Sequence, residues 1–171
     1  DCSWSRGLGD VYKSQPADMK KAADICINAK MRRVGICGAA ETLLMDQTIS
    51  STDMSMIVKQ LLDSGCEVRG TDIIAACDNR IVPATDADWG CEFLAPILAV
   101  KTVSGLDEAI SHIRLNGSGH TESIITEDMG EAETFLSEID SAIVMVNAST
   151  QFADGGEFGL SLIHISEPTR P

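Results

Sequence analysis

Four segments of the chain carry apolar residues at the spacing of amphipathic helices. The first covers residues 17–30, where apolar residues from Met19 to Ile27 share one face and a cap is expected at Ala17 or Asp18. The second covers residues 51–65, begins with an N-cap candidate and ends in glycine. Residues 104–117 and 128–140 show the same kind of pattern and predict two more helices.

Short apolar runs alternate with these helices and predict buried strands. The runs cover residues 41–46, 66–70, 96–103, 122–127 and 141–147, whereas residues 78–90 follow no regular pattern. Strands that alternate with helices of this length are joined by right-handed crossovers, which align them in parallel. The sequence therefore predicts an α/β fold, with a mostly parallel sheet and helices on both faces.

Composition limits the classes of partner. The 171 residues are 44% hydrophobic, which is enough for one domain with one sizeable core. The net charge of -13 and the pI near 4.4 repel phosphate backbones, so nucleic acid is not expected as a partner. No apolar run reaches the ~18 residues that a membrane span needs, and the polar start DCSWSRGLGD does not resemble a signal peptide. We therefore expect a soluble, cytoplasmic protein without a membrane partner.

Six cysteines are scattered through the chain, too sparsely for a disulfide scaffold. None of them forms a C-x-x-C pair, and the three histidines are far from ligand spacing, so no structural metal site is expected. Most of the thiols are expected to be reduced and buried.

One cysteine has neighbours that would favour its ionised, nucleophilic form. In AKMRRVGICGAAETLL, residues 29–44, Cys37 lies between two glycines and follows a basic cluster, which consists of Lys30, Arg32 and Arg33. A thiolate is populated at neutral pH when cations or backbone N–H groups lie near it, and the same cations suit a phosphoryl leaving group. From the residues alone, Cys37 is either a nucleophile or a small buried residue, and the charges form either a site or a solvated helix end.

Three stretches resemble one enzyme family in their order, their spacing and the identity of their residues. They are NAKMRRVGICGAAETLL (28–44), WGCEFLAPILAVKTVSGLDEAISHIRLNGSGHTESIITED (89–128) and SAIVMVNASTQFADGGEFG (141–159). Through them the chain resembles, from about Gly7 to Gly159, the catalytic domain of the gamma-glutamyl phosphate reductases, or glutamate-5-semialdehyde dehydrogenases, of the aldehyde dehydrogenase superfamily.

The resemblance implies a reductase that converts L-glutamate 5-phosphate to L-glutamate 5-semialdehyde with NADPH, a step of proline biosynthesis. It implies that Cys37 displaces phosphate to form a thioester, which hydride then reduces. It further implies a homo-oligomer for the full-length enzyme and glutamate 5-kinase as a partner. The alternatives are another aldehyde or acyl phosphate dehydrogenase on the same scaffold, or a non-catalytic assembly module.

The resemblance also assigns residues around the cysteine. Glu92, four residues before Pro96, is implied to contact the nicotinamide ribose, since a carboxylate accepts hydrogen bonds from a diol. The alternative for Glu92 is an exposed loop carboxylate. Arg32 and Arg33 are implied to bind the substrate.

Asn147, Ser149 and Thr150 of NAST are implied to line the substrate pocket. They follow a strand, where the carboxyl ends of parallel strands meet ligands, although turn chemistry is the alternative. His120 of GSGH is implied either to face the pocket or to close a turn. Because nucleophile and substrate loop must meet, we expect Cys37 at the rim of the sheet near Asn147.

The chain also departs from the family. Gln151 stands where many members carry arginine, and Gly9 and Asp10 replace a cysteine–histidine pair. No phosphate loop of the G-x-G-x-x-G or G-x-x-x-x-G-K-[ST] kind is present, so we expect the main NADPH-binding half of the family to be absent from this sequence. We therefore expect a partial enzyme that is inactive by itself.

The last residues do not continue the α/β pattern. Residues 1–160 are assigned to the catalytic domain, whereas LSLIHISEPTRP, residues 160–171, has no matching strand or helix pattern and resembles translated sequencing-adapter text. We expect residues 161–171 to be a non-native tail, and the alternative is a native flexible tail.

Overall fold

The computed structural model describes residues 9–14 and 18–153, which form an α/β fold; the tail over 161–171 lies outside them. Seven strands of the described part make one sheet in the order β4-β3-β5-β2-β1-β6-β7, with every neighbouring pair parallel. The strands are β1 (Gly9–Lys13), β2 (Ala40–Asp46), β3 (Glu67–Gly70), β4 (Val82–Pro83), β5 (Ile97–Val103), β6 (Thr121–Ile125) and β7 (Ile143–Val146). The predicted fold class is confirmed.

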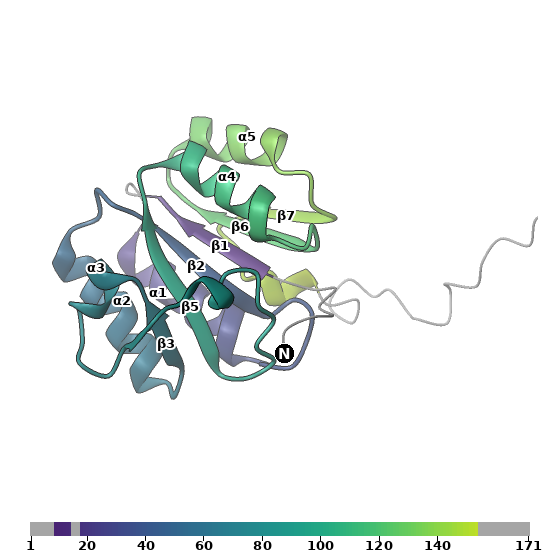
Figure 1. Cartoon of the computed structure of the whole chain (residues 1–171). Coiled ribbons are helices and arrows are strands. Elements are labelled where there is room, and N and C mark those ends of the chain that lie inside the picture. Colours follow the sequence, from purple (N-terminus) through teal and green to yellow (C-terminus); the bar gives the residue numbers. More distant parts are fainter. Residues whose placement is uncertain (1–8, 15–17, 154–171) are drawn as a thin grey trace, which may run out of the picture.

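Helices cover both faces of the sheet (Figure 1). Those of the described residues are α1 (Met19–Met31), α2 (Ser51–Asp63), α3 (Asp72–Ala75), α4 (Leu106–Asn116) and α5 (Met129–Glu138), with short 3-10 turns η1 (Asp86–Asp88) and η2 (Thr150–Ala153). The side chains of Asp18, Ser50 and Asp128 cap α1, α2 and α5 by accepting hydrogen bonds from first-turn N–H groups. None of these helices has the length and apolar content to cross a bilayer.

The alternation of side chains along β2 explains why both faces need cover. Leu43 and Met45 join the apolar cluster formed with α1 and α2, whereas Leu44 joins the cluster formed with α4 and α5. Each of these side chains is buried, which contributes roughly 1.5–3 kcal/mol per residue. The sheet is thus fixed between two helical layers, and its strand ends are left to carry the loops.

Patterning does not predict the central strand β1. Its sequence GDVYK contains Asp10 and Lys13, which are 2% and 0% exposed, so the apolar signal is lost although the strand is buried. The expectation of an irregular stretch over 78–90 is also wrong in part, because β4 and η1 lie within it.

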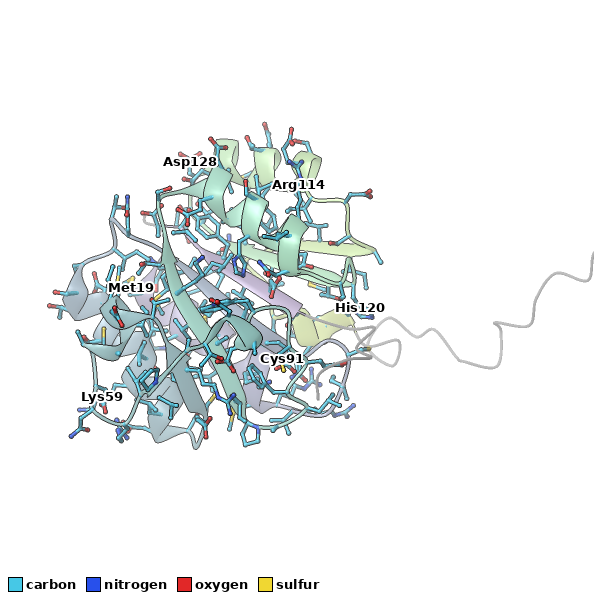
Figure 2. The ribbon with its side chains drawn as sticks, in the orientation of Figure 1. Met19, Lys59, Cys91, Arg114, His120 and Asp128 are labelled. Carbon is cyan, nitrogen blue, oxygen red and sulfur yellow. The ribbon has the colours of Figure 1, made fainter. Side chains whose placement is uncertain are left out.

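Since all strands run parallel, their first residues share one edge of the sheet and their last residues share the other. We call these the amino edge and the carboxyl edge. His120 precedes β6 and marks the amino edge, whereas Asp128 follows β6 and Met19 follows β1, so both mark the carboxyl edge (Figure 2). A residue directly before a strand therefore lies at the amino edge, and a residue directly after a strand lies at the carboxyl edge.

Candidate active site

Cys37 lies at the amino edge, in the turn that joins α1 to β2. It is exposed and carries a free thiol, whereas Cys26 and Cys66 are buried free thiols and Cys77 is half-buried. Burial raises the pKa of Cys26 and of Cys66 to about 12, so these two thiols stay protonated. Cys37 is therefore not a small buried residue, and its sulfur is open to a reactant.

The segment that carries Glu92 meets the start of the same strand. Glu92 itself is half-buried, and the backbone of Phe93 and Leu94 interacts with the carboxyl of Glu41, the second residue of β2. Leu94 has a φ of 52°, a left-handed conformation that costs a non-glycine residue about 1–2 kcal/mol. The structure thus brings the Glu92 segment and Cys37 to the same edge of the sheet.

Lys30 does not belong to a surface cluster. Its Nζ lies 2.6 Å from Oε2 of Glu41, and the two side chains are 0% and 1% exposed. The same Nζ lies 6.0 Å from the ring centre of Phe93. Burial lowers the pKa of Lys30 and raises that of Glu41 to about 7, and the attraction between the two opposes both shifts. The expectation that Lys30 could hold a phosphoryl group is wrong, because the ammonium is enclosed and ties α1 to β2.

Arg32 and Arg33 follow α1 directly and are exposed. The guanidinium of Arg32 lies 5.8 Å from the ring centre of Phe152, within range of a cation–π contact. Both arginines precede the Cys37 turn at the amino edge, so their assignment to substrate binding stays a prediction that the placement allows.

His120 also lies at the amino edge, two strands across from β2 in the order β2-β1-β6, which is about 10 Å. It is half-buried, and its Nδ1 lies 2.7 Å from Oγ1 of Thr121. Its backbone carbonyl accepts a hydrogen bond from Ile143 N at 3.0 Å, which joins it to the start of β7. A role in the pocket stays a prediction.

Asn147 lies at the opposite edge, because it follows its strand whereas Cys37 precedes one. Its backbone N–H donates to Ile124 O at 2.8 Å, near the end of β6. Its side-chain amide accepts from Thr126 N at 3.1 Å and donates to Thr126 O at 2.8 Å. The expectation that Cys37 lies near Asn147 is therefore wrong. The Asn147 amide bonds to the residue directly after β6, and its assignment to the substrate stays a prediction.

Beyond Asn147 the chain reverses and returns along β6, where Ser123 Oγ donates to Ala148 O at 2.7 Å. Ser149 and Thr150 are 2% and 0% exposed. The hydroxyl of Ser149 accepts from Gln151 N at 3.2 Å, which is turn chemistry of the kind that serine favours. Substrate binding by Ser149 and Thr150 stays a prediction.

Two buried features at the amino edge were not predicted from the sequence. Gln151 is 1% exposed and bonds to the end of α1, and Asp10 N donates to Oε2 of Glu122 at 3.0 Å within a pair of buried carboxyls. Both departures from the family were visible in the sequence, but their partners lie more than a hundred positions away. Among the described residues, no group of three or more histidine, cysteine or acidic side chains could hold a metal ion.

Comparisons with known proteins show what the whole chain is similar to. Residues 81–159 match the model of the aldehyde dehydrogenase family. The gamma-glutamyl phosphate reductases of Bradyrhizobium diazoefficiens and Methylorubrum extorquens are 53% and 55% identical over 153 residues, 90% of this chain and 35% of each relative. The crystal structure of gamma-glutamyl phosphate reductase from Thermotoga maritima is 46% identical and superposes with a TM-score of 0.87 over 91% of this chain and 37% of that one.

The chain spans about a third of the length of the curated relatives it matches. An acetylating aldehyde dehydrogenase from Geobacillus thermoglucosidasius shares the fold, with a TM-score of 0.67 at 21% identity over 88% of this chain and 42% of that one. Over 90% of its length the chain is therefore similar to gamma-glutamyl phosphate reductases, and its residues 81–159 match the aldehyde dehydrogenase family.

Proposed function

We propose that this chain is the catalytic portion of a reductase that converts L-glutamate 5-phosphate to L-glutamate 5-semialdehyde in proline biosynthesis. The observation that carries the proposal is the exposed free thiol of Cys37, in a turn at the edge where the Glu92 segment also lies. Relatives named gamma-glutamyl phosphate reductase, at 53–55% identity, support the choice of reaction.

Cys37 acts through its thiolate in this proposal. The sulfur attacks the carbonyl carbon of the acyl phosphate, the new S–C bond forms, and the bond from that carbon to the phosphate oxygen breaks. Inorganic phosphate leaves and a thioester stays on the protein. Arg32 and Arg33, directly before the turn, are proposed to stabilise the departing phosphate, and His120 to meet the glutamyl group.

NADPH, when bound, would supply the hydride that reduces the thioester carbonyl; cleavage of the S–C bond would then release the aldehyde and return Cys37 as its thiolate. Glu92 is the residue of this chain proposed to hold the cofactor, since its half-buried carboxylate lies at the amino edge and suits the ribose hydroxyls. One carboxylate does not bind a dinucleotide whose pyrophosphate has no partner. The chain alone is therefore proposed to be inactive in reduction, and the homo-oligomer and the contact with glutamate 5-kinase are proposed only for the full-length enzyme.

Acylation of Cys37 tests the proposal without cofactor. The protein is incubated with acetyl phosphate, and the modified residue is located by mass spectrometry while released phosphate is measured. We expect acylation of Cys37 with an equivalent of phosphate, no acylation of half-buried Cys77, and neither product with Cys37→Ser.

The same assay separates the alternatives. Acylation by acetyl coenzyme A but not by acetyl phosphate would favour another member of the family. If neither donor acylates Cys37, the nucleophile assignment fails, and an assembly module becomes the better description.

A further inference from the structure

The turn that carries Cys37 is fastened at its beginning by a residue far away in the chain. Nε2 of Gln151 donates to the carbonyl of Arg33 at 2.9 Å and to the carbonyl of Ala29, in the last turn of α1, at 2.9 Å. Gln151 is 1% exposed, so water does not compete for these bonds. One amide thereby joins the end of α1 to the residue from which the turn departs.

The other end of the turn packs closely against the residue before Gln151. A Cβ atom on Gly38 would lie 2.9 Å from the carbonyl oxygen of Thr150, closer than real Cβ atoms come to backbone. Gly38 is buried, whereas Gly35 in the same turn is exposed and has open space around its Cβ position. Only the second glycine is therefore required for a close approach.

Cys37 lies between these two anchors. Ala39 N donates to Ile36 O at 2.9 Å, which closes a β-turn with Cys37 at its second position. The anchoring residues are themselves held, since Phe152 N donates to Ser149 O at 3.0 Å and Gln151 N to Ser149 Oγ at 3.2 Å. The position of the sulfur thus depends on a second turn that belongs to a different part of the chain.

We propose that Thr150 and Gln151 are positioning residues, which hold the Cys37 turn at both ends and so set the reactivity of its thiol. This inference rests on the proposed function, because it takes Cys37 as the nucleophile. It gives Thr150 a role in holding the turn that carries the nucleophile, and it gives the Gln151 amide the role of donating two hydrogen bonds to backbone carbonyls.

Two substitutions remove one anchor each. Gln151→Leu keeps the approximate size of the side chain and removes both donated bonds; Oε1 of Gln151 has no hydrogen-bond partner within the described residues, so nothing else is lost there. Gly38→Ala places a methyl group against the Thr150 carbonyl. Gly35→Ala is the matched control in the same turn.

Trypsin cleavage reports directly on the bond from Gln151. Trypsin cleaves the peptide bond after Arg33, and the carbonyl of that bond accepts the hydrogen bond from Gln151. We expect Gln151→Leu and Gly38→Ala to speed cleavage between Arg33 and Val34 about tenfold, because the first removes the bonds donated by Gln151 and the second displaces the backbone of Thr150 and Gln151, while Gly35→Ala leaves it unchanged. Unfolding in urea identifies any variant that is globally unfolded, and the other variant then carries the test.

Alkylation of Cys37 by iodoacetamide, measured by mass spectrometry with Cys77 as internal reference, reports on positioning. We expect both anchor variants to change the alkylation rate toward that of an unstructured cysteine peptide, and the control to match the parent. Faster cleavage without a changed alkylation rate would overturn the positioning role, and so would unchanged cleavage. If the alkylation rate changes in the variants while acetyl phosphate fails to acylate the parent, the proposed function fails and the anchoring stands.

Discussion

Replacing Glu122 with glutamine should make the stability of this protein much less dependent on pH. Glu122 is 0% exposed in β6, and its carboxyl accepts from Asp10 N at 3.0 Å and from Ser141 Oγ at 3.4 Å. Burial, reinforced by the nearby Asp10, raises its pKa well above the ordinary value of 4.5. Burial also raises the pKa of Asp10, so the native pair keeps a proton near neutral pH.

Retaining this proton destabilises the native state relative to the unfolded chain, and the destabilisation grows as pH rises. The unfolded chain loses it above pH 4.5, whereas the native protein retains it, so the free energy of unfolding falls as pH rises. Each pH unit costs about 1.4 kcal/mol, so the native state is weakened by about 4 kcal/mol at three units above that value. Glutamine imitates the protonated carboxyl, because its oxygen accepts from Asp10 N and it carries no titrating proton.

Urea unfolding of parent and Glu122→Gln at pH 5, 6, 7 and 8 measures the effect. The two proteins should be similar near pH 5, and the variant should gain about 1.4 kcal/mol over the parent for each further unit. Glu133→Gln, at an exposed position of α5, is the control and should follow the parent. A difference between Glu122→Gln and the parent that stays constant from pH 5 to 8 would refute the retained proton.

Three further outcomes follow from particular contacts. Lys30→Met leaves a buried carboxylate without its partner and should lower the free energy of unfolding by about 3 kcal/mol, whereas Lys20→Met, at an exposed pair, should change it by less than about 1 kcal/mol in the same urea experiment. Gly65→Ala, at a φ of 89° after α2, should cost about 1–2 kcal/mol in urea unfolding, whereas Gly35→Ala should cost almost nothing. Calorimetry with NADPH at millimolar concentration should detect no binding to this chain, and tight binding would contradict the assignment of Glu92 as its one cofactor contact.

The helices and most strands were predictable because their signals are local. A periodic apolar face lies within one helix, and its cap lies directly before it. Asp18 caps α1 as predicted and Asp128 caps α5, whereas the cap of α2 is Ser50, one residue before the predicted candidate at position 51. The central strand β1 was not predictable in this way, since it buries Asp10 and Lys13. Its place is decided by strands on both sides, β2 and β6, which begin about 30 and 110 residues later.

The buried polar pairs show a similar limit. Lys30 reads as one cation among three in the sequence, but its partner Glu41 lies on a strand beneath it. Gln151 reads as the loss of an arginine, but its amide donates to two backbone carbonyls, which have no signature in side-chain identity. Partners of this kind are set by tertiary packing, so neither composition nor local spacing reports them.

The sequence does indicate at which edge of the sheet each candidate residue lies, because a residue either precedes or follows its predicted strand. Cys37 precedes the strand ETLLMD, Glu92 precedes PILAVKTV and His120 precedes ESIITE, so all three lie at the amino edge. Asn147 follows a strand and is placed at the carboxyl edge, where ligands of open α/β sheets usually bind. That general rule assigned Asn147 to a ligand site at the carboxyl edge, whereas the nucleophile Cys37 lies at the amino edge. The site predicted from the sequence was therefore divided between two edges of the sheet. The structure resolves the conflict through the return of residues 148–151 along β6, which brings Thr150 and Gln151, but not Asn147, to the two ends of the turn that carries the cysteine.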